Sequence, residues 1–541
     1  MLLFKIITKK ISTTLKIFFS DLPSYSFPLI GDLVRRLPPI RVTNYSRKYK
    51  ILVQCVYDPY FLSLFSTIVS ALSNSIPLKV QLFIPASVNS SIGISPISYF
   101  LRSAFPNLLV ARQWIRAYSE FSDEVGYRSV SFEFPFEDAI CWLRSLVLWL
   151  TLRNSNDVEN IQIEGISCGD LIIDTYLRFF PSPCLEIGNF FLFYVIWQAH
   201  RDIFRSRRYF IQQKPELYLT SYTTYIQHGI AVRVALMLGV PTISLSSLQL
   251  LSPCYPFHSK NPTNYRAQFL DRTDQRQLLL SAKNKLECRL NGGIDSATFY
   301  MNETAYSTKR LSDIDLSNSV VIFLHDFFDS PHIYQSRMLF PDFWSWACFT
   351  IETLAESGIS FYIKPHPNQI SLSSSVIKSL IAKYPNVNML PARISNRQLV
   401  DNELRCGITM YGTIAHELAY LGVPSIACGI HPHVSFDFCK TASSLQEYSH
   451  LLKNSLAICY ENLADVKLQV LQFYTMHYLN SSDSMLQMQD SLIELSAILQ
   501  ESEKSCTMDT IDQIINKLEN IRAGNGFAEF LTNILRALGD E

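Results

Sequence analysis

Residues 319–429 decide the fold of this chain. They begin with SVVIFLHDFFDSPH (319–332), continue through SFYIKPHP (360–367) and reach CGITMYGTIAHELAYLG (406–422). Each quoted stretch places a short apolar run before a polar turn, and amphipathic segments of helical length lie between them. Strands that alternate with helices of about ten residues predict a parallel sheet that helices cover on both faces.

A second region of the same kind lies nearer the N-terminus. Strands are predicted at ILVQ (51–54), KVQLFIP (79–85) and ELYLTSY (216–222), with helices over Phe61–Ser73 and Ile226–Gly239. The chain is therefore predicted to have an α/β fold, with two Rossmann-like domains facing a cleft and a helical C-terminal tail.

Composition divides the chain into five predicted segments. Residues 1–50 are basic, and residues 481–541 form an acidic helical tail. The two Rossmann-like domains are predicted at 51–253 and 319–480. The polar residues 254–318 are predicted to connect them.

The composition also excludes several classes of protein. With 48% hydrophobic and 17% charged residues, the 541-residue chain is too rich in core residues to be disordered or fibrous. Basic and acidic residues balance at 47 each, so nucleic acid is not an expected partner. Twelve cysteines without a Cys-x-x-Cys pair predict reduced thiols and a cytoplasmic location.

No apolar stretch reaches the roughly 18 residues that a membrane-spanning helix needs. The nearest candidates, Leu143–Leu152 and Phe190–Trp197, are predicted to be buried helices. Lysines interrupt the apolar residues of MLLFKIITKKISTTLKIFF (1–19), which excludes a secretory signal. This stretch is predicted to be a basic tail or, alternatively, an amphipathic segment at the anionic inner face of the plasma membrane.

Polar side chains follow the strands of the second predicted sheet. Ligands of open parallel sheets bind at the carboxyl ends of the strands. The candidate substrate-binding residues at these ends, or in the helix that follows, are His325, Asp326, Asp329, His332, Lys364, His366, Tyr411, Gly412, Thr413, Glu417 and His431. Gly412 and Thr413 begin a helix whose first amides can bind an anion, and the side chains of Lys364 and His366 suit a phosphate.

Two catalytic candidates lie in the first domain. His228 has a reference pKa near neutrality and is predicted to remove a proton from an acceptor hydroxyl. Asp58 follows the first strand and is the second candidate, although a turn residue before Pro59 is the simpler interpretation. The chain lacks G-x-G-x-x-G and Walker motifs, so neither NAD nor any other cofactor is predicted.

Four motifs carry a resemblance to a known group of proteins. FLHDFFDSPH (323–332), IKPHPN (363–368) and YGTIAHELAYLGVPSIA (411–427) resemble GT-B glycosyltransferases. They resemble more closely the bacterial capsule and lipopolysaccharide biosynthesis proteins, including Kdo transferases and CDP-glycerol glycerophosphotransferases. QHGI (227–230) is similar to the His-Gly element of the glycerophosphotransferases.

The resemblance implies an enzyme that transfers a sugar from a nucleotide-sugar donor to a growing surface polysaccharide. It implies a donor site in the second domain, where Lys364 and His366 contact the phosphate. It further implies that Gly412 and Thr413 supply the anion-binding turn and that Glu417 reaches the ribose. A glycan or lipid-linked glycan acceptor would bind the first domain.

Three alternatives remain open from the sequence. A non-hydrolysing nucleotide-sugar 2-epimerase has the same architecture but converts its donor without an acceptor. A metal-dependent hydrolase could take its ligands from His325, Asp329, His332, His431 and His433. An inactive scaffold or polysaccharide-binding protein is the third alternative.

Overall fold

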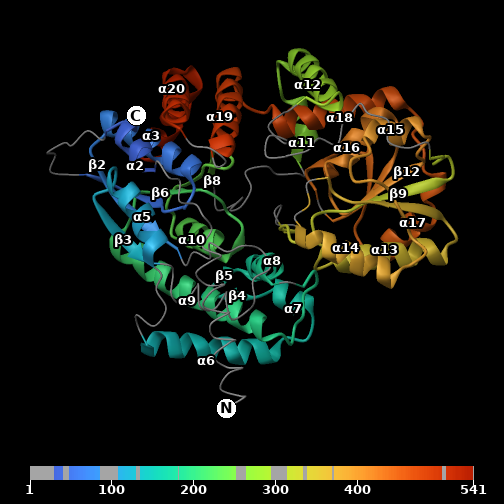
Figure 1. The fold of residues 1–541 in the computed structure, drawn as a ribbon, viewed down its shortest axis with the longest axis horizontal. Coiled ribbons are helices and arrows are strands. Elements are labelled where there is room, and N and C mark those ends of the chain that lie inside the picture. The colour runs from blue at the N-terminus through green and yellow to red at the C-terminus, as the bar shows by residue number, and fades with distance from the viewer. Residues whose placement is uncertain are drawn as a thin grey trace. The chain divides into compact units, whose positions relative to one another are not determined.

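The structure is a computed structural model that describes most of the chain. The described residues are 30–39, 48–85, 108–128, 135–180, 182–251, 264–293, 314–332, 338–367, 369, 371–429, 431–502 and 507–539. The basic stretch 1–19, with its predicted membrane segment, lies outside them. The chain divides into unit 1, made of Met1–Pro181, Glu186–Ser259 and Asp483–Glu541, and unit 2, made of Ser182–Leu185 and Lys260–Ser482 (Figure 1).

Unit 1 is built on a sheet that has six strands in the described part of the chain, in the order β3-β2-β1-β6-β7-β8. These strands are β1 (Tyr49–Gln54), β2 (Leu78–Ile84), β3 (Glu124–Arg128), β6 (Leu217–Thr220), β7 (Thr242–Ser244) and β8 (Gln249–Leu251). Neighbouring strands run parallel, except that β8 runs antiparallel to β7. The strand order changes direction between β1 and β6, which is where ligands of such sheets bind.

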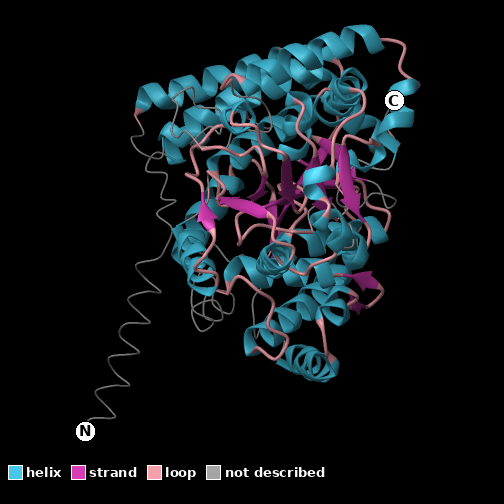
Figure 2. Ribbon diagram, turned by 90° about the vertical axis from the view of Figure 1, so that its right-hand side faces the viewer, coloured by secondary structure: helices cyan, strands magenta, loops and turns pink. Residues whose placement is uncertain are grey.

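Helices cover both faces of this sheet. Figure 2 shows strands of the structure enclosed between helices. Those on one face include α2 (Ile30–Arg36), α3 (Pro59–Ser75) and α5 (Leu108–Ser119), and those on the other include α9 (Phe190–Gln213) and α10 (Tyr225–Met237). Side chains alternate between the faces along each strand. Val80 of β2 therefore joins the α3 core, whereas Phe83 contacts the ring of Phe210 in α9.

A further set of helices packs on α9 rather than on the sheet. It consists of α6 (Pro135–Thr151) and α8 (Gly169–Phe179), with the short α7 (Ser155–Glu159) beside α8. A two-stranded hairpin, β4 (Gln162–Ile163) and β5 (Ile166–Ser167), joins α7 to α8. The α9 helix therefore lies between the sheet and α6.

The C-terminal helices complete the core of unit 1. They are α19 (Asp483–Ser502), α20 (Met508–Ala523) and α21 (Asn525–Ala537), and all three contact α3 (Figure 1). Leu495, Ile514 and Ile534 are fully buried in the same cluster as Phe65 of α3. The end of the chain is thus a structural part of the unit with which the chain begins.

Unit 2 repeats the strand order of unit 1. Its sheet runs β11-β10-β9-β12-β13-β14, with every neighbouring pair parallel. The strands are β9 (Ser319–Phe323), β10 (Ser360–Lys364), β11 (Asn388–Met389), β12 (Cys406–Thr409), β13 (Ser425–Cys428) and β14 (Cys439–Ala442). The change of direction falls between β9 and β12.

Two groups of helices enclose this second sheet (Figure 1). One face carries α13 (Phe343–Glu356), α14 (Ser371–Lys383) and α17 (Leu445–Lys453), and the other carries α15 (Asn396–Asp401), α16 (Ile414–Leu421) and α18 (Leu463–Tyr478). Helices α11 (Tyr265–Leu270) and α12 (Gln275–Leu290) pack against α18. The described helices of the segment 254–318 therefore belong to unit 2.

The predicted α/β fold with two Rossmann-like domains and a helical C-terminal region is confirmed. The prediction that Leu143–Leu152 is a buried helix is wrong, because Leu143, Val147 and Leu150 of α6 are 58%, 64% and 68% exposed. The matching prediction for Phe190–Trp197 is correct except at Phe190, which is 67% exposed. Within the described residues, no helix combines the length and the apolar character needed to cross a bilayer.

The packing of the C-terminal helices can be tested at Leu495. Leu495→Ala is expected to lower the free energy of unfolding of unit 1 by about 2–5 kcal/mol, because it leaves a cavity in the shared core. Amide hydrogen exchange followed by mass spectrometry should show faster exchange in β1 and β2. The control Leu468→Ala changes a side chain that is 41% exposed, and it should leave unit 1 unchanged. Equal exchange in both variants would contradict this packing.

Candidate functional site

The carboxyl edge of the unit 2 sheet gathers residues from three loops. Strand β9 lies between β10 and β12, so the loops that follow these strands meet at one edge. They carry His325 after β9, His366 after β10, and the Tyr411–Thr413 turn after β12. The structure therefore brings together the predicted phosphate-binding residues. We call this group of residues the unit 2 edge.

His325 lies at the centre of the unit 2 edge. Its Nε2 is 3.1 Å from the Thr409 hydroxyl, which also accepts a hydrogen bond from the Gly412 amide (2.9 Å). The ring stacks on Phe343 at a centroid distance of 4.6 Å. Burial, together with the neighbouring His366, lowers the pKa of His325 to about 3. The imidazole is therefore neutral at pH 7.

Lys364 provides the positive charge of the unit 2 edge, and His366 lies beside it as a neutral imidazole. Lys364 is 3% exposed, and its ammonium donates to the Ala392 carbonyl oxygen (3.2 Å). Burial lowers the pKa of Lys364 to about 8, so the ammonium is still mostly charged at pH 7. Burial and the Lys364 charge lower the pKa of His366 to about 4. A buried ammonium beside neutral imidazoles favours an anionic ligand.

The turn before α16 packs closely against Thr409 and His325. A Cβ atom on Gly412 would lie 2.7 Å from the Thr409 hydroxyl, so this position requires glycine. The Tyr411 hydroxyl donates to the Ser330 carbonyl oxygen (2.9 Å), which ties the turn to the loop after β9. The N-terminus of α16 at Ile414 carries the positive end of the helix dipole, and the Ala415 amide of this first turn donates to the Gly412 carbonyl oxygen (3.1 Å).

Asp326, Asp329 and His332, which were also predicted to bind substrate, lie in the loop that follows β9. Asp326 accepts hydrogen bonds from the Phe328 amide (3.0 Å) and the Ser373 hydroxyl (2.8 Å). Asp329 is exposed and accepts from the Ser330 amide, whereas His332 is buried. Their predicted contacts with substrate stay predictions.

Glu417 takes part in a buried ion pair. Its Oε1 lies 2.8 Å from the guanidinium of Arg289 in α12, and its Oε2 accepts from the side-chain Nδ2 of Asn396 (3.0 Å). Glu417 is 2% exposed, as is Arg289. Both oxygens therefore have protein partners, and the predicted contact of Glu417 with a ribose stays a prediction.

His431 belongs to a cluster of buried histidines behind the unit 2 edge. Its ring centroid lies 4.1 Å from that of His433 and 6.2 Å from that of His477. His416 and His433 both contact the Phe473 ring. In the described part of the chain, no three histidine, cysteine or acidic side chains are placed to hold one metal ion. The ligand set considered for a metal-dependent hydrolase is therefore not assembled.

The corresponding edge of unit 1 holds His228. Gln54 ends β1, and its side-chain Nε2 lies 2.9 Å from His228 Nδ1. The Gln54 Oε1 atom accepts hydrogen bonds from the Ser221 amide (2.9 Å), the Ser221 hydroxyl (2.7 Å) and the Thr220 hydroxyl (3.0 Å). These residues meet where β1 and β6 lie side by side.

This network fixes the proton of the neutral His228 ring. The Ser221 amide can only donate, so the oxygen of Gln54 must face it and the NH2 group must face His228. Nδ1 then accepts, and the ring proton lies on Nε2. Burial lowers the pKa of His228 to about 4, which keeps the ring neutral at pH 7.

Asp58 occupies the N-cap of α3. Its Oδ1 accepts from the Tyr60 amide (2.8 Å), and Pro59 follows at the first helical position. This geometry matches the interpretation of Asp58 as a turn residue. Its predicted catalytic role stays a prediction.

Gln54, Thr409 and Arg289 are not among the residues predicted from the sequence. Gln54 and Thr409 end apolar strands, and each binds a histidine of its edge. A polar residue at the last position of an otherwise apolar strand is a signal that could have found both. Arg289 lies 128 residues before Glu417 and leaves no local signal.

The known proteins that match this chain resemble it only distantly. No family model matches the sequence, and no curated protein matches it. One similar solved structure is an S. aureus MnaA–UDP structure, with 9% sequence identity, coverage of 84% of this chain and 97% of that chain, and a TM-score of 0.26. The glycotransferase of kitacinnamycin has 12% identity, covers 83% of this chain and 99% of that chain, and has a TM-score of 0.25. MurG of Acinetobacter baumannii has 12% identity and the same two coverages, with a TM-score of 0.22. TM-scores of this size carry no argument about activity or substrate.

The hydrogen bond between Gln54 and His228 leads to a test by titration. Gln54→Glu is expected to raise the pKa of His228 from about 4 to about 6.5 or above, because a carboxylate at Nδ1 favours the imidazolium. NMR titration of the histidine ring carbons measures this pKa, and His228→Gln identifies its signal. The control Gln54→Met removes the donor without adding charge. An unchanged pKa in Gln54→Glu would show that residue 54 does not set the protonation of His228.

Buried neutral histidines should make unit 2 sensitive to acid. Burial lowers the pKa of His325 and His433 to about 3 and that of His366 to about 4, below the unfolded value of about 6.5. The unfolded state binds these protons first, so stability falls as pH drops from about 6.5 to 4, by up to about 1.4 kcal/mol per pH unit for each histidine. The free energy of unfolding of His433→Phe, measured in urea, should depend less on pH, because unfolding of this variant takes up about one proton fewer. The exposed control His450→Asn should not change this dependence.

Proposed function

We propose that this protein is a glycosyltransferase of GT-B type, which moves a sugar from a nucleotide-sugar donor to a glycan or lipid-linked glycan. One observation carries the proposal. The buried ammonium of Lys364, the neutral imidazoles of His325 and His366, and the first turn of α16 come from three neighbouring loops at one sheet edge. That combination of groups suits the diphosphate of a nucleotide sugar.

The chemistry of the transfer gives these groups a role. When an acceptor hydroxyl attacks the anomeric carbon, the bond to the donor phosphate breaks and the nucleoside diphosphate leaves with the electron pair. Negative charge then grows on the leaving phosphate oxygen. Lys364 and the N-terminus of α16 would stabilise this charge, because they are fixed in place before the reaction begins.

The edge of unit 1 is proposed to serve the acceptor. Sequence reasoning assigns His228 as the base that takes the hydroxyl proton. With Nδ1 accepting from Gln54, however, the neutral ring presents Nε2–H. We therefore favour His228 as a hydrogen-bond donor to a substrate oxygen, and Asp58 becomes the candidate base. A surface polysaccharide as the product is proposed from the motif resemblance, and action at the inner face of a membrane is proposed from the basic stretch 1–19.

Nucleotide binding tests the proposed donor site. Lys364→Met and His366→Ala are each expected to weaken binding of the preferred nucleoside diphosphate by about 10- to 100-fold, because each removes a contact to a charged phosphate. Isothermal titration with CDP, UDP and GDP measures the affinity. Lys378→Met, which changes an exposed lysine of α14, is the matched control. Unaltered affinity in both edge variants would overturn the assignment of the phosphate site.

Acceptor dependence separates the proposed transferase from a 2-epimerase. A labelled nucleotide sugar is incubated with the protein, with and without a lipid-linked glycan, and the products are separated. A transferase is expected to release nucleoside diphosphate in step with sugar transfer. Conversion of the donor to its epimer without any acceptor would establish the alternative.

A further inference from the structure

The outward face of α6 is apolar along its whole length. Its exposed apolar side chains are Phe136 (90% exposed), Ile140 (53%), Leu143 (58%), Val147 (64%) and Leu150 (68%). Steps of four and three residues place them in one stripe on the helix. The 17 residues of α6 span about 25 Å at 1.5 Å per residue. In Figure 1 the helix lies at the outer edge of unit 1, with α9 on its inner side.

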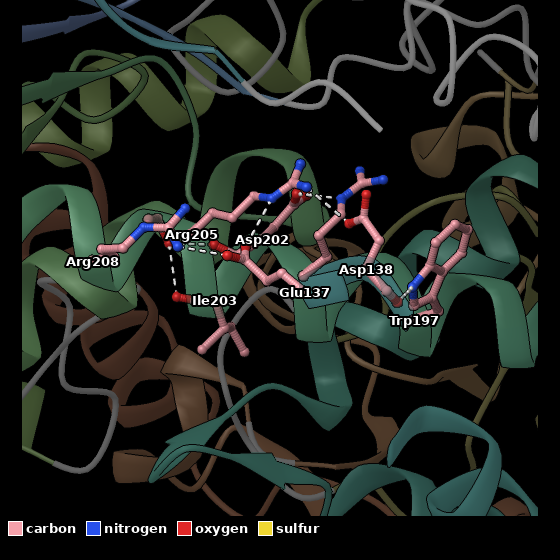
Figure 3. A network of polar contacts seen from close by, with 9 residues as sticks. Glu137, Asp138, Trp197, Asp202, Ile203, Arg205 and Arg208 are labelled. Atoms are coloured by element: carbon pink, nitrogen blue, oxygen red, sulfur yellow. Dashed lines mark hydrogen bonds and ion pairs between the residues drawn. The ribbon is translucent and has the colours of Figure 1, made fainter. Parts of the chain in front are cut away.

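The inward face of α6 is polar, and ion pairs fix it there. Glu137 accepts from Arg205 (3.0 Å) and Arg208 (2.5 Å) of α9, and Asp138 accepts from Arg205 (2.8 Å), as Figure 3 shows. Arg205 and Asp138 are each 3% exposed. Turning the helix over would leave these buried charges without partners, which is strongly unfavourable. The apolar stripe is therefore held towards solvent.

Aromatic side chains broaden this face. Trp142 is 38% exposed and contacts the ring of Phe193 in α9, which also contacts Trp149. Phe190, at the start of α9, is 67% exposed and lies against the same Phe193 ring. Tryptophan and phenylalanine are the residues that amphipathic helices place at the boundary between lipid headgroups and acyl chains.

Basic side chains outnumber acidic side chains around this face. Over α6, α9 and the residues that directly follow each helix, the charged side chains that reach solvent are Arg144, Arg153, Arg207, Arg208 and Lys214. The acidic residues of the two helices, Glu137, Asp138 and Asp202, are at most 13% exposed. Glu164 of the β4–β5 turn bridges Arg144 and Arg207. Glu186, which precedes α9, is also exposed, so the rim of the apolar face carries an excess of basic over acidic side chains.

We propose that the outward face of α6 binds the interfacial region of an anionic lipid bilayer. The apolar stripe would enter the boundary between headgroups and acyl chains, and the basic rim would lie against the anionic headgroups. This inference does not rest on the proposed function, because it uses only α6 and its surroundings.

The breadth of the apolar face favours lipid over a second copy of the chain. The stripe has the spacing of a coiled-coil seam, and such a seam is flanked by charged residues that pair across the two helices. Here the exposed residues beside the stripe include Ala139 and Trp142, and Arg144 is the one exposed charged residue of α6. A face of this breadth suits a continuous lipid surface.

Vesicle binding tests the proposal with the full chain. The triple variant Ile140→Gln, Leu143→Gln and Val147→Gln removes the middle of the stripe. It is expected to bind vesicles of phosphatidylglycerol and phosphatidylcholine roughly 100-fold more weakly than the unchanged protein, because three apolar side chains no longer enter the lipid. Binding should fall as salt rises from about 0.1 to 1 M, and it should be weaker on pure phosphatidylcholine.

A matched control uses apolar side chains that are equally exposed elsewhere. Leu270→Gln, Leu280→Gln and Met508→Gln change residues that are 62%, 61% and 50% exposed, and they should leave binding unchanged. A second variant lacks residues 1–20, so that the contribution of the basic N-terminal stretch is measured separately. The proposal requires the stripe variant to lose binding whether or not residues 1–20 are present.

Two results would overturn the proposal. One is equal vesicle binding by the unchanged protein and the stripe variant. The other is a dimer of the unchanged protein, seen by analytical ultracentrifugation, that the stripe variant does not form, while neither protein binds vesicles. That result would assign the face to a second copy of the chain.

Fluorescence gives an independent readout. Brominated lipids should quench the tryptophan fluorescence of the unchanged protein, and Trp142→Phe should reduce that quenching.

Discussion

Parallel strand pairing is the constraint on which the rest of this structure depends. A parallel strand can follow another only through a crossover, so the carboxyl ends of the parallel strands gather at one edge of the sheet. In both units the strand order changes direction once, between β1 and β6 and between β9 and β12. Two loops diverge at that point, which leaves room for a ligand. His228 and His325 lie at these two points.

The two edges are held by the same kind of contact. A polar residue ends a central strand in each unit, and its side chain binds the histidine next to it: Gln54 binds His228, and Thr409 binds His325. Burial keeps both imidazoles neutral. Each edge therefore presents hydrogen-bonding groups in a fixed orientation, and Lys364 adds a positive charge to the edge of unit 2 alone.

Helix α6 shows how buried ion pairs can decide the orientation of an amphipathic helix. Its polar face is the one that packs, because Arg205 and Arg208 of α9 offer partners to Glu137 and Asp138. The charges that α9 places at this interface cannot be left without partners. The apolar side chains then have no protein surface to cover within the described residues of unit 1, and they face outward.

The sequence by itself determined the local pattern: alternating strands and helices, two Rossmann-like domains, the helical tail, and the polar residues that follow the strands. Those features depend on periodicity and turn chemistry over ten to twenty residues, which a linear reading captures. Tertiary structure alone decided that the C-terminal helices complete the core of unit 1, that Gln54 meets His228 across 174 residues, and that Arg289 holds Glu417. It also decided which face of α6 is buried. An apolar stripe in the sequence indicates that a helix has an apolar and a polar face. Which of these faces packs against the protein depends on residues far away in the chain.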